Sequence, residues 1–121
     1  MRTTTSSQAA SRYMEHRWGE RIALDCPARL VLYDGAMSEG RLRNASISGA
    51  FIITVVRLTP LTPLNVMLAL GLGMHRRCVE LPACVVRCPR EGLAVEWRDM
   101  AIPTVQTLLR EAGASGFRVR G

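Results

Sequence analysis

The sequence predicts a mainly β protein, a small six-stranded antiparallel barrel with one helix packed on it at the C-terminal end. Six extended segments follow one another within about 70 residues, and no stretch of helical period separates them. The pair Asp34-Gly35 marks a tight hairpin after the first segment. With 121 residues, the chain is long enough for one domain with a hydrophobic core.

The six expected strands are short extended segments separated by turn residues, and the one at 50–56 is apolar and β-branched. They are residues 28–33, 39–44, 50–56, 65–72, 75–88 and 92–97. The apolar segment 50–56 is expected in the core. Pro60 and Pro63 cannot donate to a strand ladder, so they separate the third strand from the fourth.

A single amphipathic helix is predicted after the last strand, over residues 102–112. Pro103 suits a first helical turn, and Gly113 is expected to end the helix. Apolar side chains recur at i, i+3, i+4 and i+7 as Val105, Leu108, Leu109 and Ala112. We expect this stripe to pack on the barrel and to close one of its ends.

These elements divide the chain into a central domain, residues 12–112, and two tails. Within the domain we expect an arm over 12–27, the barrel over 28–98 and the helix over 102–112. Residues 1–11 are rich in Ser and Thr and are expected to be disordered, while 113–121 form a basic tail.

The charge of the chain favours anionic partners. Its formal net charge is +6, and all 16 cationic residues are arginine, whose planar fork of donors matches phosphate oxygens and the edge of guanine. A GC-rich genome would also enrich arginine, so composition alone does not identify a ligand. No apolar run is long enough to span a bilayer and the N-terminus lacks a signal sequence, so we expect a cytoplasmic protein.

The four cysteines are expected to be buried and reduced. Cys26, Cys78, Cys84 and Cys88 show no metal-binding spacing, so we expect no metal site. The sequence also has no catalytic triad, no phosphate-binding glycine loop and no other cofactor motif. We therefore expect a binding protein without a cofactor rather than an enzyme.

Two short motifs carry the candidate site. Arg17 and Arg21 stand four residues apart before the first strand, where alone they are typical of a solvated pair. Asn44, Ser46 and Gly49 lie in a polar stretch between two strands. Asn and Ser can cap backbone groups or bond a ligand, and glycine permits positive φ or close backbone approach.

Taken together, Arg-x-x-x-Arg and the later Asn-x-Ser-x-x-Gly resemble the signature of the PilZ family. The Gly-Leu-Ala-Val-Glu-Trp segment at 92–97 is similar to the last core strand of that family. The resemblance covers roughly residues 12–112. It implies a six-stranded antiparallel barrel with a flanking helix that acts as a bacterial receptor for cyclic di-GMP.

Carried over to this chain, the resemblance implies a ligand clamp made of two parts. Arg17 and Arg21 would grip guanine edges and phosphates, while Asn44, Ser46 and Gly49 would form the turn that receives a guanine and its ribose-phosphate. Arg12 and His16 are expected secondary contacts. The residue at the His16 position influences how many ligand copies bind, which leaves one or two dinucleotides open.

The expected mechanism is that the ligand pins a mobile arm across the barrel and so creates a face for a protein effector, in control of motility, biofilm or exopolysaccharide. A homodimer is a further expectation, with segment 50–56 or the helix as its surface. Two alternatives remain: a PilZ-like interaction module without ligand binding, and a basic barrel that binds nucleic acid. The scattered aromatic residues disfavour nucleic acid, because single-stranded binders need aromatic platforms.

Overall fold

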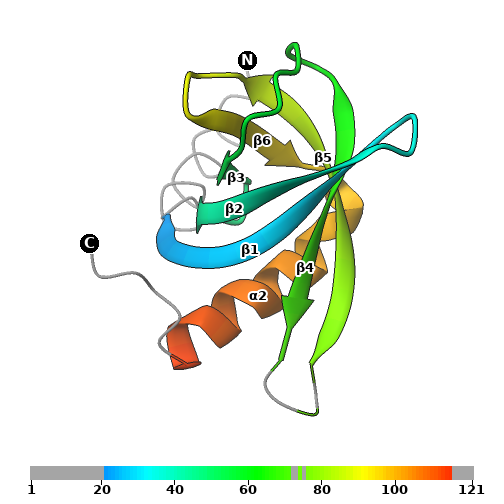
Figure 1. Ribbon diagram of the computed structural model, residues 1–121. Coiled ribbons are helices and arrows are strands. Elements are labelled where there is room, and N and C mark those ends of the chain that lie inside the picture. The colour runs from blue at the N-terminus through cyan, green and yellow to red at the C-terminus, as the bar shows by residue number, and fades with distance from the viewer. Residues whose placement is uncertain (1–20, 72–73, 75, 116–121) are drawn as a thin grey trace, which may run out of the picture.

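The computed structural model describes residues 21–71, 74 and 76–115, and it shows a closed six-stranded barrel with one long helix beside it (Figure 1). The strands are β1 (Ile22–Leu32), β2 (Met37–Ala45), β3 (Gly49–Ile53), β4 (Pro63–Leu70), β5 (Arg77–Arg87) and β6 (Gly92–Trp97). A short 3-10 helix η2 (Asp99–Ala101) leads into α2 (Ile102–Ser115). The predicted fold class is therefore confirmed.

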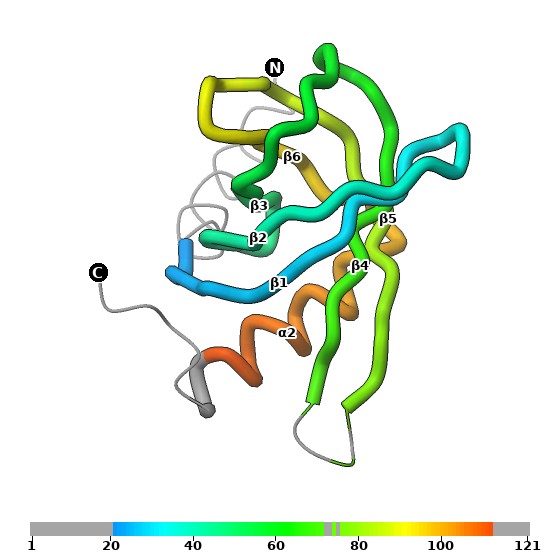
Figure 2. Tube along the Cα trace, viewed as in Figure 1, coloured from blue at the N-terminus to red at the C-terminus, as the bar shows by residue number. Residues whose placement is uncertain are grey.

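Neighbouring strands pair antiparallel in the order β1-β2-β3-β6-β5-β4, and β4 returns to β1 to close the barrel. Figure 2 traces the course of the chain through these strands. Since side chains alternate across a strand, every second residue faces the interior. The interior side chains form one hydrophobic core, which includes Leu30, Leu42, Ile52, Val66 and Leu81.

The first strand begins earlier than the sequence indicated. Residues 22–27, which the sequence analysis assigns to the arm, belong to β1. Ile22 and Ala23 pair with the end of β2, and a register shift separates this short ladder from the one that starts at Cys26. The irregular register hides the strand from a simple alternation pattern, because one extra residue changes which face each side chain takes.

The third strand is shorter than expected, since β3 ends at Ile53 instead of reaching residue 56. Thr54 leaves the ladder: its hydroxyl donates to the carbonyl of Glu39 at 2.9 Å, and its N–H donates to the carbonyl of Glu91 at 3.2 Å. Val55 is then 87% exposed. The apolar run alone could not indicate this end, because Val is as typical of a strand as Ile.

The Asp34-Gly35 hairpin is confirmed between β1 and β2. Gly35 has φ of 91°, a region that favours glycine, and the Asp34 carboxylate accepts a hydrogen bond from the N–H of Ala36 at 3.0 Å. The N–H of Gly35 donates to the carbonyl of Leu32 at 2.9 Å. In Figure 1 this hairpin projects from the side of the barrel.

Helix α2 packs through the predicted stripe, since Val105, Leu108 and Ala112 are buried and Leu109 contacts the core. The helix continues to Ser115, however, so Gly113 does not end it. A glycine within a helix costs only about 1 kcal/mol relative to alanine, so it does not by itself stop a helix. At its far end, the Glu111 carboxylate accepts a hydrogen bond from the N–H of Gly71 after β4, at 3.2 Å.

The prediction of four buried cysteines is wrong. Cys78 is exposed, and Cys26, Cys84 and Cys88 are only half-buried; all four are free thiols. The strands of a small barrel alternate between core and solvent, and these cysteines occupy positions that are not fully interior. Within residues 21–71, 74 and 76–115, no group of three or more His, Cys, Asp or Glu side chains is placed to hold a metal ion.

No helix in the described part of the chain is both long and apolar enough to cross a bilayer.

Candidate functional site

The Asn-x-Ser-x-x-Gly motif forms the tight connection between β2 and β3, with Ser46 at its centre. Ser46 is fully buried, and its N–H donates to the carbonyl of Gly49 at 2.8 Å. Its hydroxyl accepts hydrogen bonds from the N–H groups of Ser48 and Gly49 at 3.2 and 3.3 Å. Ser46 therefore caps the backbone of the turn from inside and holds its shape.

Trp97, the last residue of β6, braces the same turn from the core. Its indole N–H donates to the carbonyl of Ser46 at 3.0 Å, and its backbone N–H donates to the carbonyl of Ser48, also at 3.0 Å. The Trp97 side chain is 5% exposed, so these bonds are shielded from water. From the sequence, Trp97 was expected as the last residue of a core strand, without a part in the motif turn. Buried backbone carbonyls in a tight turn need hydrogen-bond donors, and this requirement could have indicated a role for Trp97.

Position 49 requires glycine because a side chain there would clash with a neighbouring strand, and not because its backbone has positive φ. Among the glycines that the structure describes, positive φ occurs at Gly35 and Gly71, and Gly49 is not one of them. A Cβ added to Gly49 would lie 2.2 Å from the carbonyl oxygen of Val95 on β6. The close approach of the β3 and β6 backbones therefore excludes every side chain at this position. Phe51 belongs to the segment 50–56 that was expected in the core, but it is only half-buried, while Ala50 and Ile52 face the core.

The structure brings together one residue from each half of the motif. The Arg21 guanidinium donates from Nη1 to the Asn44 side-chain oxygen at 2.8 Å. Because the Asn44 amide is neutral, this bond positions Arg21 without cancelling its charge, which an aspartate would do. Arg17, Arg12 and His16 lie outside the described residues, as does most of the arm.

Next to this pair, the outer surface of β2 and β3 offers further groups. A register shift between Leu42 and Asn44 lets Leu42 face the core while Asn44 pairs with Phe51 and Arg41 pairs with Ile53. Arg41 and Asn44 are therefore both available to a ligand on the outside of the barrel. Arg41 forms an ion pair with Asp25 of β1, in which Nε lies 2.6 Å from the carboxylate.

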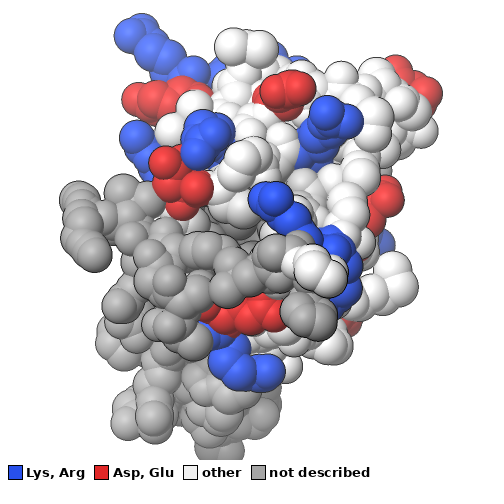
Figure 3. All heavy atoms as spheres, turned by 60° about the horizontal axis from the view of Figure 1, so that its bottom comes forward, with Lys and Arg blue, Asp and Glu red and all other residues white. Residues whose placement is uncertain are grey.

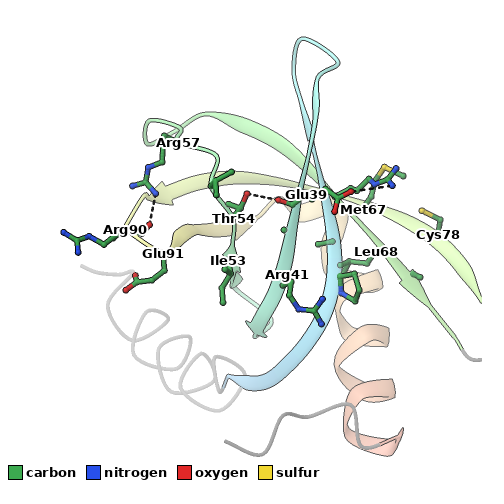
Figure 4. A pocket seen from close by; sticks show the side chains of 16 residues that line it. Glu39, Arg41, Ile53, Thr54, Arg57, Met67, Leu68, Cys78, Arg90 and Glu91 are labelled. Carbon is green, nitrogen blue, oxygen red and sulfur yellow. Dashed lines mark hydrogen bonds and ion pairs between the residues drawn. The ribbon is translucent and has the colours of Figure 1, made fainter.

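An open hollow of about 1390 Å³ extends from Arg41 and Ile53 across the outside of the barrel (Figure 4). Figure 4 shows Arg90 and Glu91 on one side of Arg41 and Met67 and Cys78 on the other. Four arginines and two glutamates line the hollow, together with apolar side chains: Arg29, Arg41, Arg57, Arg90, Glu39 and Glu91. Mixed polar and apolar walls suit a ligand that carries both charge and ring faces.

Arg57 stabilises the backbone beside this hollow. Its guanidinium donates to the carbonyls of Cys88 and Arg90, at 2.7 and 3.2 Å, and so braces the turn between β5 and β6. Arg21 differs from it, because its described hydrogen bond is to a side chain of the motif.

One thiol near the site has an altered acidity. Burial raises the pKa of Cys26 above its ordinary value, while the nearby positive charges of Arg41 and Arg76 act in the opposite direction. Burial wins because the thiolate loses more hydration than these exposed arginines restore. Cys26 is therefore a neutral thiol at physiological pH.

The comparisons with known proteins agree with the observed fold. The family model described as the PilZ domain matches residues 14–112. The chain therefore belongs to the PilZ domain family, whose members are generally receptors for cyclic di-GMP and are binding modules rather than enzymes. None of the curated proteins compared matches the chain.

Two solved PilZ domains share the fold. The PilZ domain of CeSA from a cellulose-synthesizing bacterium is 19% identical, with a TM-score of 0.61, and the match covers 75% of this chain and 98% of that one. The PilZ domain of YcgR from Escherichia coli, solved with cyclic di-GMP, is 15% identical, with a TM-score of 0.56, and the match covers 83% and 96%. At these identities, the likeness extends to the fold alone.

Proposed function

We propose that this chain is a cytoplasmic receptor for cyclic di-GMP that acts without catalysis or a cofactor. The observation that carries the proposal is the contact between Arg21 and Asn44 beside the rigid turn of Ser46 and Gly49. A guanidinium held at the barrel surface suits a phosphate or the O6/N7 edge of guanine, and the ligand supplies both. We propose Arg17, Arg21, Asn44, Ser46 and Gly49 as the site, with Arg12 and His16 as secondary contacts.

The arm and the barrel have to act together to reach useful affinity. A micromolar complex needs about 8 kcal/mol, while one charged hydrogen bond contributes about 1.5–3 kcal/mol before the cost of ordering the arm is subtracted. Base stacking and the polar groups of the turn must therefore add to the arginines. We propose that the bound ligand orders the arm over the barrel, and that the new face is read by a protein effector.

The direct test is calorimetric titration of the full chain with cyclic di-GMP, GMP and a single-stranded oligonucleotide. We expect the dinucleotide alone to bind with a Kd in the micromolar range or below, and Arg21→Ala to weaken it by tenfold or more, about 1.4 kcal/mol. Arg110→Ala, which removes an exposed arginine from α2, is the matched control and should bind normally. Absence of dinucleotide binding at tens of micromolar would refute the proposal.

The arm mechanism has its own test by backbone NMR of the same protein. We expect amide signals of the arm, residues 12–21, to become protected and dispersed when cyclic di-GMP is added. An arm that is equally ordered with and without the ligand would leave the receptor proposal standing but would exclude this switch. Cyclic di-GMP stoichiometry, one or two per chain, follows from the same calorimetric curve.

A nucleic-acid-binding barrel is the weaker alternative. On the face that Figure 3 displays, described acidic side chains stand among the arginines instead of leaving one continuous basic stripe. Binding along a nucleic acid backbone depends on such a stripe. Tight binding of the oligonucleotide in the titration would favour this alternative over a receptor.

A further inference from the structure

The outer wall made by β1, β4 and β5 lies away from the Ser46–Gly49 turn, and it shares only its edge at Arg29 and Met67 with the large hollow. Leu30 of β1, Val66 of β4 and Leu81 of β5 face the core, so their neighbours along each strand face outward. The strand registers place the outward residues in two rows across this wall, Val31-Asn65-Pro82 and Arg29-Met67-Glu80. We call this surface, made by those two rows, the β4 face.

The first row of the β4 face is apolar at its ends. Beside it lies an open hollow of about 380 Å³, whose walls include Val31, Tyr33, Pro82 and Met100. Tyr33 and Met100 are 83% and 78% exposed. Large apolar side chains in such a group beside a hollow are typical of a surface that contacts another protein.

The second row carries opposite charges on either side of an apolar centre. Met67 pairs with Arg29 on one flank and with Glu80 on the other. Strands lie about 4.8 Å apart, so the two charged positions are separated by roughly 10 Å. The nearest described acid to Arg29 is Glu39, at 4.0 Å in an exposed pair, which leaves Arg29 free to take a better partner.

We propose that the β4 face pairs two copies of this chain about a two-fold axis that runs along β4. Such an axis leaves Met67 facing Met67 and exchanges the two flanks, so Arg29 of each copy meets Glu80 of the other. An isologous interface requires this kind of self-complementary surface. An axis across the strands would instead set Arg29 against Arg29, so the charges select one arrangement.

The same axis also matches the apolar groups of the first row. It sets the β1 side of one copy, with Val31 and Tyr33, against the β5 side of the other, with Pro82 and Met100. Two sheets packed in this way lie about 10 Å apart with their strands nearly aligned, which is close enough for both rows to interlock. Charge and hydrophobicity therefore agree on one geometry.

The motif turn at Ser46 and Gly49 remains open in this dimer, while the edge of the hollow at Arg29 and Met67 is covered. In the closed barrel order β1-β2-β3-β6-β5-β4, strand β4 stands three places from β3 in either direction, so it is opposite the turn that precedes β3. Pairing through the β4 face thus directs the two candidate ligand sites away from each other. This proposal does not depend on the identity of the ligand.

The test is sedimentation equilibrium of the full chain without ligand, over roughly 5–500 µM. We expect a reversible dimer, and we expect Glu80→Arg or Arg29→Glu alone to raise its dissociation constant about tenfold or more, because each variant brings like charges together twice per interface. Glu91→Arg, on an exposed residue of the β5–β6 turn, makes the same charge change away from the β4 face and should dimerise normally.

Mixing the two variants is the decisive measurement. Arg29→Glu has acidic groups at both positions and Glu80→Arg has basic groups at both, so an equimolar mixture should form a heterodimer about as well as the unmodified chain. A variant that had merely unfolded could not regain association in this way. A chain that stays monomeric to 500 µM, a dimer insensitive to both substitutions, or a mixture without recovery would each overturn the proposal.

Discussion

Trp97 shows how one buried hydrogen bond can hold the motif turn in shape. Its indole N–H is the partner of the Ser46 carbonyl at 3.0 Å, and Trp97→Phe would keep most of the ring while leaving that carbonyl unpaired. We expect the free energy of unfolding to fall by about 1–3 kcal/mol, the usual cost of an unsatisfied buried polar group. Urea denaturation measures this loss, and amide NMR of residues 46–49 should show the turn loosened.

The same variant tests whether Trp97 positions the turn for cyclic di-GMP. We expect Trp97→Phe to weaken binding several-fold, whereas Leu81→Ala, which opens a cavity in the core at β5, should lose as much stability or more without the same loss of affinity. If both variants lose affinity in proportion to stability, Trp97 has only a general structural role.

A second prediction for a single residue concerns the substitution of Gly49. Gly49→Ala would place a Cβ against the Val95 carbonyl, a backbone atom that can move only if the β3–β6 ladder shifts. We expect a loss of roughly 3 kcal/mol or more in urea denaturation, at the upper end of the cost of overpacking. The control is Gly35→Asn, because a Cβ there meets nothing within 4 Å, so its cost is limited to backbone strain at positive φ, which Asn bears better than most residues. Equal losses in the two variants would contradict the close-approach explanation.

At the scale of an element, the start of β1 has a pH-dependent component. Cys26 begins the ladder after the register shift, and burial raises its pKa above the ordinary value of 9.0. The folded state therefore favours the neutral thiol. Its contribution to stability is complete below pH 9.0 and is lost as the pH rises through the higher pKa of the folded state.

We therefore expect Cys26→Ala to show a smaller alkaline loss of stability than the unmodified chain, measured by urea denaturation at several pH values from 8 upward under reducing conditions. Cys78→Ala, which removes an exposed thiol from β5, is the control. An identical alkaline slope for Cys26→Ala and the unmodified chain would show that this thiol is not the cause.

At the scale of the whole molecule, the two proposed surfaces should act independently. Cyclic di-GMP at 100 times its Kd should raise the free energy of unfolding by about 2.7 kcal/mol, because it binds only the folded chain. Since β4 stands opposite β3, Glu80→Arg should keep that shift while it weakens dimerisation. Thermal denaturation with and without ligand measures the shift. A shift lost in Glu80→Arg would mean that the surfaces are coupled.

Much of the fold could be predicted from local patterns. The Asp34-Gly35 turn, the break at Pro60 and the helical stripe of Val105 and Leu108 depend on neighbours in sequence, so the sequence contains their signal, although Pro63, expected in the same break, begins β4. The first and last residues of the strands were harder to predict from the sequence. The start of β1 depends on a register shift, and the end of β3 depends on the hydrogen bonds that Thr54 donates to the carbonyls of Glu91 and Glu39, which lie elsewhere in the chain.

The sequence by itself determined the class of fold, the family resemblance and the presence of both motif halves, because alternation, turn residues and motif spacing are local properties. Only the tertiary structure decided which structural role each motif residue has. It shows Ser46 as an internal cap, Gly49 as a point of backbone contact and Trp97 as their brace, and it brings Arg21 to Asn44. The physical reason is that these roles are contacts between strands far apart in sequence, which exist only after the barrel has closed.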